Sequence, residues 1–238
     1  VTLRYGSWSK VSREYEIMPR PTKGMTGTIK PYARTSFPAT ASEKFPTTGF
    51  KAAKFTLNGD NFSDGGRTVS DYTLKAACGG IEDSCAWVTV SGDGTVSFTG
   101  DPTPATSAVT ITATPKAGTE ASLTYTFTVS KWFRNTGSTE ANWDDTLAIW
   151  ESQGYRMPDH DILTNADLYG SASKGIGSLV GEWGNLGAYD SSWMTAAHLY
   201  YWAYDTYNGR HYTVSLNEGY LTTDPQSLER YGVCVNTL

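Results

Sequence analysis

The sequence is poor in cysteine, in charged residues and in long apolar runs. Its 238 residues include only three cysteines and three histidines, and charged residues make up 18% of the chain. No apolar stretch approaches the roughly 20 residues that a membrane-spanning helix needs. No run of Lys or Arg exceeds two residues, and the formal net charge is −5. Nucleic acid and anionic membrane surfaces are therefore poor partners for this chain.

The first residues, "VTLRYG", show no feature of a secretion signal. They contain no initiator Met, no charged segment and no apolar segment of the kind that such signals carry. We therefore expect the chain to be a fragment cut from a longer protein.

Aromatic and small residues are abundant, and the first half of the chain has strand periodicity. There are 15 Tyr, 8 Trp and 24 Gly, a composition typical of β-rich extracellular proteins. Apolar and polar residues alternate in four stretches, 54–59, 87–100, 108–115 and 122–132. Asp93-Gly94 predicts a tight hairpin turn with positive φ at both positions. Short strands separated by Gly and Pro predict an all-β sandwich over residues 41–131.

The N-terminal segment, residues 1–40, leaves two interpretations open. Its beginning, "VTLRYGSWSKVSREYEIM", alternates like a strand, and "PRPTKGMTGTIKP" is typical of a loop. The segment either adds edge strands to the sandwich or is the tail of a preceding domain.

From residue 132 onward the pattern predicts an α+β domain that extends to residue 238. Asn142 is expected to cap a first helix that Gly154 ends. Pro158 is expected to start a second helix that runs to Gly170. A Gly-rich run follows at 175–187, and two late strands are expected at 211–219 and 230–237.

Two of the three cysteines lie close together in the sequence. Cys78 and Cys85 flank "GGIEDS", which can turn back on itself. A local disulfide there would imply an oxidising compartment, and the other interpretation is two free, half-buried thiols.

Several motifs together resemble the C-terminal domains of intimin and invasin family adhesins. "FPTTGFKAAKFTL", "WVTVSGDGTVSF" and "YTFTVSKWF" resemble a bacterial immunoglobulin-like domain of that family. "WESQGYRMPDHDIL", "GEWGNLGAYDSSW", "YYWAYD", "HYTVSLNEG" and "YGVCV" resemble its C-type lectin-like domain. The resemblance covers about residues 41–238, and it implies an immunoglobulin-like sandwich followed by an α+β C-type lectin-like domain. The residues that match the structural signature of the lectin-like domain are Trp150, Trp183, Gly184, Tyr189, Trp193 and Trp202.

The resemblance also implies a location and a role. Members of this family are anchored in the bacterial outer membrane and carry the lectin-like domain at the host-facing tip. It implies an extracellular, monomeric binding module for a host protein, either a cell-surface receptor or a secreted mucosal protein such as an immunoglobulin. Two alternatives stay open: a glycan-binding lectin, and a structural cap of a rod.

One departure from the family concerns Cys234. Members typically link the first helix to the last strand with a disulfide, and Cys234 matches the last-strand cysteine. The helix position that should hold its partner is Trp150. We therefore expect Cys234 to be a buried free thiol and Trp150 to fill the space of the lost bridge, with the surrounding core repacked.

Residue patterns for metal, cofactor or catalytic chemistry are weak or missing. The sequence contains no Glu-Pro-Asn, Gln-Pro-Asp or Trp-Asn-Asp triplet, the calcium ligands of sugar-binding lectins of this fold. His160, His198 and His211 share no metal-ligand spacing. No G-x-S-x-G nucleophile motif is present, and Asp144-Asp145 is explained by capping of the first helix. We expect no enzymatic activity, no cofactor, no metal and no calcium dependence.

Two loops are the candidate recognition surface. "YDTYNGRHY" (204–212) predicts an exposed hairpin tip with Asn208-Gly209 as its turn. "TTDPQSLER" (222–230) predicts a second loop. Tyr and Arg are enriched where proteins bind proteins, although both loops can also be plain solvated surface. The candidate ligand-binding residues are Tyr204, Asp205, Tyr207, Asn208, Arg210, Asp224 and Arg230.

Overall fold

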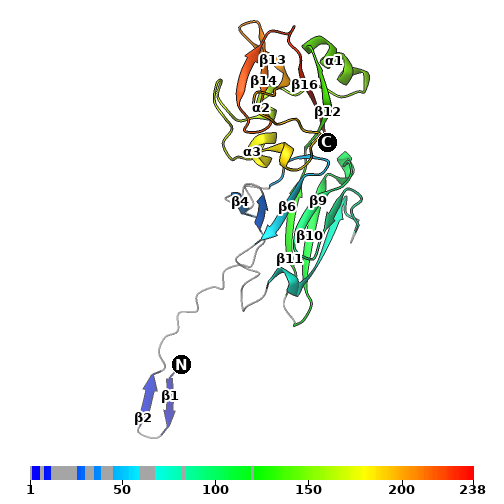
Figure 1. Ribbon diagram of the computed structural model, residues 1–238. Helices are drawn as coiled ribbons and strands as arrows, with labels where there is room; N and C mark the ends of the chain where they lie inside the picture. Colours follow the sequence, from blue (N-terminus) through cyan, green and yellow to red (C-terminus); the bar gives the residue numbers. More distant parts are fainter. Residues whose placement is uncertain are drawn as a thin grey trace.

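The computed structural model describes residues 45–58, 68–81, 84–118 and 121–238, and the backbone of four short strands before them. It is mostly β with few helices (Figure 1). In chain order the strands are β1 (Thr2–Tyr5), β2 (Trp8–Val11), β3 (Thr26–Ile29), β4 (Thr35–Pro38), β5 (Thr48–Phe50), β6 (Lys54–Asn58), β7 (Tyr72–Cys78), β8 (Val88–Val90), β9 (Thr95–Phe98), β10 (Ala108–Pro115), β11 (Leu123–Thr128), β12 (Lys131–Ala141), β13 (Tyr201–Tyr207), β14 (Arg210–Val214), β15 (Leu221–Asp224) and β16 (Arg230–Thr237). The helices are α1 (Trp143–Ser152), α2 (His160–Leu163) and α3 (Leu179–Trp183), and single 3-10 turns lie at Val69–Asp71, Pro104–Thr106 and Leu186–Ala188.

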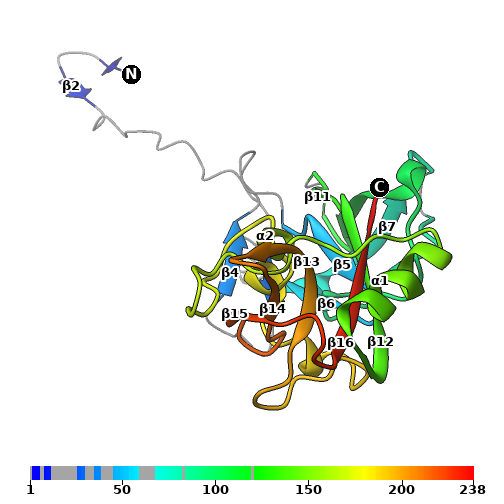
Figure 2. The ribbon, with the colours of Figure 1, turned by 90° about the horizontal axis from the view of Figure 1, so that it is seen from above.

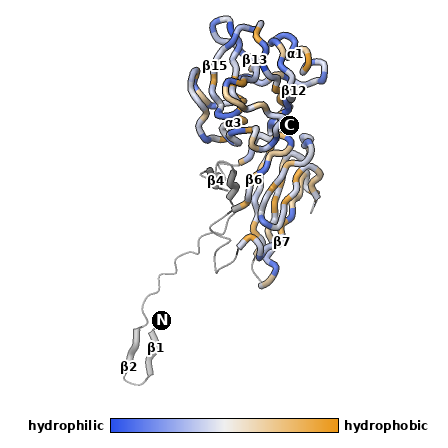
Figure 3. Tube along the Cα trace, viewed as in Figure 1, coloured by the Kyte–Doolittle hydropathy of each residue, from blue (hydrophilic) through white to orange (hydrophobic). Residues whose placement is uncertain are grey.

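Strands β3–β4 and β6–β11 form two sheets that share an aromatic core. We call this part of the molecule the lower half, after its position in Figure 1. The strand orders of the two sheets are β4-β3-β6-β9-β8 and β11-β10-β7. In β11 buried and exposed residues alternate strictly, as the period-two pattern predicted. Phe127 of β11 meets Phe55 and Phe98 of the other sheet, with ring centroids 5.7 and 6.0 Å apart. Figure 3 shows hydrophobic segments along the strands of this half.

The predicted hairpin at Asp93-Gly94 is confirmed, but its turn geometry is different. Strands β8 and β9 pair with Val88 opposite Phe98. Of the two turn residues only Gly94 has positive φ, at +85°. Gly94 N donates to Ser91 O at 3.0 Å, and Asp93 Oδ1 accepts from Thr95 N at 3.0 Å. The longer loop removes the need for positive φ at Asp93.

Part of the N-terminal segment extends one of these sheets. Strand β3 pairs with β6, with Thr26 opposite Asn58, and β4 pairs with β3 at the sheet edge. Strands β1 and β2 pair with each other. The rest of residues 1–44 lies outside the described residues.

The other half of the molecule, which lies above it in Figure 1, is built on one sheet that we call the upper sheet. Its strand order is β15-β14-β13-β16-β12-β5, so it contains both the early strand β5 and the last strand, β16. Strand β12 pairs antiparallel with β16, and its register shifts between Asn135 and Glu140. Strand β5, which lies between β4 and β6 of the lower half in sequence, pairs in parallel with β12. The alternating stretch 122–132 is divided between two sheets, because the chain leaves the lower half after Thr128 and enters the upper sheet at Lys131.

Helix α1 follows the prediction closely. The Asn142 side chain accepts a hydrogen bond from Asp145 N at 2.9 Å and so caps the helix. Gly154 has a φ of +76° directly after the last turn.

The predicted second helix is wrong beyond its first turn. It runs only from His160 to Leu163, because Thr164 is extended and its hydroxyl donates to Gly219 O at 2.7 Å. The Asn165 side chain then binds the backbone of Ser173. Thr and Asn side chains here satisfy backbone groups outside a helix, which competes with helix formation.

The late strands are also corrected. The strand expected over 211–219 ends at Val214, and β15 begins at Leu221, where a loop was expected over 222–230. Helix α3 lies inside the Gly-rich run, where no helix was expected. The strand predicted over 230–237 is confirmed as β16.

Helices α1 and α2 lie on opposite faces of the upper sheet (Figures 1 and 2). His211 of β14 stacks on Trp143 of α1, and the next residue, Tyr212, stacks on His160 of α2. Consecutive strand residues point to opposite faces, so the two helices cover different sides. The α2 side belongs to the main core, and the α1 side has a separate small core of Trp150, Met157, Trp202 and Cys234.

A seam joins the two halves, which we define as the contact between residues 45–50 and helix α3. The indole of Trp183 is fully buried, and its ring lies 5.1 Å from Phe45 and 5.5 Å from Phe50. Trp183 Nε1 donates to Thr48 O at 3.1 Å. A residue of the expected lectin-like signature therefore packs into the aromatic core of the lower half.

Candidate binding surface

The hairpin between β13 and β14 has the predicted turn. Tyr207 pairs with Arg210, and Asn208 and Gly209 between them have φ values of +50° and +74°. Positive φ at both residues is the geometry that Asn-Gly favours in a two-residue hairpin. The sequence therefore located this turn correctly.

On the α1 side of the hairpin, three aromatic rings are in contact. The rings of Trp143 and His211 stack with centroids 3.9 Å apart, and Tyr204 lies 5.9 Å from Trp143. Trp143 Nε1 donates to Ala203 O at 3.0 Å, which fixes the indole. Burial lowers the pKa of His211, so the neutral imidazole is favoured in the stack. Tyr204 is 52% exposed and forms the outer part of this cluster.

Beside Tyr204 lies a groove between helix α1 and strand β13. We call it the α1 groove; its volume is about 290 Å³, and its lining residues are Leu147, Glu151, Tyr155, Arg156, Met157 and Tyr204. Tyr204 N donates to Pro158 O at 2.9 Å, which ties the segment after Met157 to the strand. Arg134 lies over the Tyr155 ring at 4.8 Å and forms an ion pair with Asp101.

On the α2 side the hairpin carries a different group. The Asp205 carboxylate accepts from His160 N at 2.9 Å and also contacts the imidazole of His160. His160 stacks on Tyr212 with ring centroids 4.1 Å apart, and Tyr207 lies 6.2 Å from Tyr212. Asp205 therefore anchors α2 to the sheet, and Tyr207, at 46% exposure, is the open member of this group.

The charged candidates at the other end of the surface bind one another. Arg230 Nε lies 2.9 Å from Asp224 Oδ2, and an Arg210 guanidinium nitrogen lies 3.8 Å from Asp224 Oδ1. Asp224 also accepts from Thr213 Oγ1 at 3.1 Å. Arg230 further lies over the Tyr200 ring at 5.8 Å. These side chains are held by internal contacts, which leaves less of their hydrogen-bonding capacity for a ligand.

The structure thus divides six of the seven candidate residues into three groups rather than one patch, and the seventh, Asn208, lies in the hairpin turn. Sequence reasoning missed the α1 groove, whose walls come from segments more than 45 residues apart in the chain. The available signal was the segment "YRMP" directly after the first helix, where an aromatic, a cation and an apolar residue adjoin.

The signature tryptophans are packing residues. Trp183 and Trp202 are fully buried, Trp193 is 3% exposed and Trp150 is 4% exposed. Gly184 ends α3 with a φ of +67°, and Tyr189 Oη donates to Trp183 O at 3.0 Å. None of the six signature residues is exposed, so they build the fold rather than the surface.

The three cysteines take two roles. Cys78 and Cys85 form a disulfide, as one of the two interpretations predicted. Cys234 is 1% exposed and not in a disulfide, and burial raises its pKa to about 12. It packs in one small core with Trp150. A Cβ at Gly232 would lie 2.6 Å from Thr136 Cγ2, 3.0 Å from Thr146 Cγ2 and 3.3 Å from Trp150 Nε1, so the strand can pass this crowded point only as glycine.

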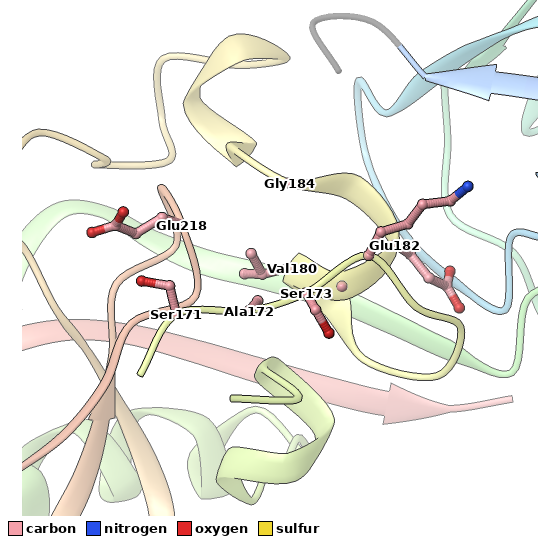
Figure 4. Close-up of a pocket in the computed structure, with 9 residues that line it drawn as sticks. Ser171, Ala172, Ser173, Val180, Glu182, Gly184 and Glu218 are labelled. Carbon is pink, nitrogen blue, oxygen red and sulfur yellow. The ribbon is translucent and has the colours of Figure 1, made fainter. Parts of the chain in front are cut away.

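A second hollow of about 260 Å³ lies beside α3 (Figure 4). Its wall includes Ser171, Ser173 and Glu218, and it borders the α3 carboxylate Glu182. Glu182 points away from the serines and binds the seam instead. Its oxygens accept from Thr48 N at 2.9 Å and Thr48 Oγ1 at 2.8 Å, and from Gly177 N at 2.9 Å. This carboxylate serves the fold, not the hollow.

Among the described residues, no group of three or more His, Cys, Asp or Glu side chains is placed to hold a metal ion. Within the same residues, no helix is long and apolar enough to cross a membrane.

Two solved structures share the fold of the chain. One is the crystal structure of invasin, described as a bacterial integrin-binding protein, with a TM-score of 0.69 and 24% identity over 91% of this chain and 39% of that one. The other is a C-terminal 282-residue fragment of intimin in complex with the intimin-binding domain of the translocated intimin receptor. Its TM-score is 0.53 at 16% identity, covering 82% of this chain and 60% of that one. The chain therefore shares its fold with invasin and intimin.

Sequence comparison agrees with the fold. The family described as "Invasin, domain 4" matches residues 28–127. The inverse autotransporter adhesin YeeJ of Escherichia coli (strain K12) is 31% identical over 215 residues, which is 90% of this chain. These matches fit a fragment of an intimin and invasin family adhesin. It spans 8% of the length of YeeJ.

Proposed function

We propose that this chain is the host-facing tip of a bacterial surface adhesin and that it binds a host protein without calcium. The observation that carries the proposal is the exposed aromatic surface at the β13–β14 hairpin. Tyr204 and Tyr207 are 52% and 46% exposed on its two sides, each next to further aromatic rings. Exposed Tyr with neighbouring aromatic rings is the composition that protein-binding surfaces favour.

The relatives support this kind of role. Invasin is described as integrin-binding, and intimin was solved with a receptor domain. Both are binding proteins, and YeeJ is described as an adhesin. By analogy with these proteins, we propose a cell-surface receptor or a secreted mucosal protein as the ligand, a non-enzymatic role and a monomeric chain.

The domain interpretation is also part of the proposal. We propose an immunoglobulin-like sandwich over residues 41–131 and a C-type lectin-like domain over 132–238. The two facing sheets below and the pairing of β12 with the last strand, β16, support it. The Cys78–Cys85 disulfide supports an oxidising, extracellular setting, in which a longer protein would be anchored in the outer membrane.

Calcium independence is supported by what the acidic side chains already do. Asp145 accepts from Asn142 Nδ2 at 2.7 Å at the start of α1. Asp224 accepts from Arg230 and Thr213. A calcium ion needs 6–8 oxygen ligands, and carboxylates bound to cations and amides at a helix cap are poorly placed to supply them.

Capture by the immobilised full chain tests the function. Biotinylated host epithelial surface proteins and mucosal secretions are passed over it with and without a chelator, before and after enzymatic deglycosylation. We expect a specific host protein to be retained in all four conditions. Loss on deglycosylation would indicate a glycan lectin, loss with chelator a calcium-dependent one, and no specific capture a structural cap.

A further inference from the structure

The α1 groove has an apolar interior that is held in shape before any ligand binds. Met157 is 2% exposed and packs in the small core with Trp150. The hydrogen bond from Tyr204 N to Pro158 O holds the segment after Met157 against strand β13. Tyr204 still leaves about half of its surface open above this floor. A preformed apolar recess with an aromatic wall suits one large apolar side chain.

Helix α1, which forms one wall, carries only negative charge. Asp144 and Asp145 lie in its first turn and Glu151 in its last, and the helix contains no basic residue. Glu151 lines the groove itself. All three carboxylates are exposed, so they act on whatever approaches the groove.

The rim of the groove also carries one lining cation, Arg156. Asp159, which follows the groove segment in the chain, lies close enough to Arg156 for the two charges to interact. Asp205 lies on the α2 side, where it binds His160, and it does not line the groove. The negative charge that faces a ligand therefore comes from helix α1.

We propose that the α1 groove is the docking site for a polypeptide segment that inserts one large apolar side chain between basic flanking residues. The recess fits the side chain, and the carboxylates of helix α1 favour a basic segment through charge complementarity. The proposal rests on the proposed function, because it names the site and the chemistry of the host partner. An acidic segment would meet repulsion from helix α1.

Defined peptides test the groove directly. The isotope-labelled full chain is titrated with a peptide that holds one Trp between lysines, with its glutamate counterpart, and with the lysine peptide in which Gly replaces Trp. We expect backbone amide shifts within residues 147–157 and 203–205 with the first peptide only. Equal shifts with the acidic peptide, or shifts mapped elsewhere on the chain, would overturn the proposal.

Reversing the charge at Glu151 and at Arg156 should change the affinity for the lysine–Trp peptide in opposite directions. Glu151→Lys should weaken binding of the lysine–Trp peptide by about two- to fivefold, and Arg156→Glu should strengthen it by a similar factor, as expected for exposed charge pairs. Tyr204→Ala should weaken it by at least about tenfold, as for a central interface aromatic. Tyr169→Ala is the matched control, since this tyrosine is 63% exposed on the loop after α2, and it should change nothing. A reversed order of the two charge variants would overturn the choice of a basic partner.

The capture assay separates this proposal from the function. If wild type retains a host protein and both Glu151→Lys and Tyr204→Ala retain it equally, the adhesin role stands and the groove assignment is wrong. If wild type retains nothing while the peptide shifts map to the groove, the groove assignment stands and the proposed function is wrong.

Discussion

The seam and the surface formed by the β13–β14 hairpin and the α1 groove, which we call the hairpin surface, use the same residue types for opposite purposes. At the seam, Trp183 is fully enclosed and its N–H is satisfied by Thr48. At the hairpin surface, Trp143 has an equivalent bond to Ala203 but lies under an exposed Tyr204. Buried aromatics with satisfied polar atoms stabilise a fold, whereas exposed aromatics keep apolar surface that a partner can bury.

The carboxylates show the same contrast. Glu182 is 1% exposed, and its oxygens accept hydrogen bonds from Thr47, Thr48 and Gly177. Glu151 at the α1 groove is exposed. The first carboxylate holds two halves of the molecule together, and the second remains available. Changes at the seam should therefore affect stability, and changes at the hairpin surface should affect binding.

The largest expected effect on stability is at Trp183. Trp183→Ala removes a buried indole that touches the cores of both halves, and we expect the free energy of unfolding to fall by about 3–5 kcal/mol. Trp143→Ala is the matched control, because its ring is partly exposed, and it should cost roughly half as much or less. Urea unfolding followed by far- and near-UV circular dichroism measures both. Equal losses in the two variants would remove the distinction between the regions.

The next effect is at Glu182. In Glu182→Gln an amide NH₂ group faces backbone donors, so we expect a loss of about 2–3 kcal/mol near pH 4.5. Glu218→Gln is the control, since Glu218 borders the same hollow but is exposed, and it should stay within about 0.5 kcal/mol of wild type.

The Glu182 variant also predicts a pH dependence. Burial raises the pKa of Glu182 in the folded chain above its ordinary value of 4.5. Its contribution to stability is therefore fully present below that value and is lost as the pH rises through the folded pKa. The difference in free energy of unfolding between wild type and Glu182→Gln should shrink from pH 4.5 toward neutral pH. A difference that grows over this range would contradict the raised pKa.

Cys234 should show an intermediate effect. Cys234→Ser places a hydroxyl in an apolar core and should cost about 1–3 kcal/mol. The thiol of the native protein should react slowly with a disulfide reagent, because burial raises its pKa to about 12 and little thiolate forms. Titration after denaturation should find one free thiol. Three free thiols would contradict the Cys78–Cys85 disulfide.

The smallest effect is expected at the hairpin. Tyr207→Ala removes a side chain that is 46% exposed, and we expect a change within about 0.5 kcal/mol in the free energy of unfolding. Thermal unfolding at matched protein concentration measures it. A loss comparable to that of Trp183→Ala would mean that the hairpin is part of the structural core.

Structural elements that depend on a few neighbouring residues could be predicted from the sequence. The Asn142 cap, the Gly154 helix end and the Asn208-Gly209 turn each depend on a few neighbouring residues, and each is confirmed. The second helix was overestimated, because Thr164 binds Gly219, a residue 55 positions away. Such contacts leave no periodic signal in the sequence.

Features made by distant segments were not predictable. Strand β5 joins the upper sheet through β12, and Glu182 meets Thr47 and Thr48 more than 130 residues away. The α1 groove likewise combines residues of one helix, the following segment and a late strand. The family resemblance compensated for part of this gap, since it led to the correct family before any contact was known.

One measurement tests the central claim that the hairpin surface binds a host protein while the seam stabilises the fold. The full chain carries a photo-cross-linking residue at Glu151 or, as control, at Tyr169, and is irradiated on host epithelial cells. We predict that one host protein is cross-linked from position 151 and not from 169. Equal cross-linking from both positions, or none from 151 while the same chain still binds the cells, would contradict the account.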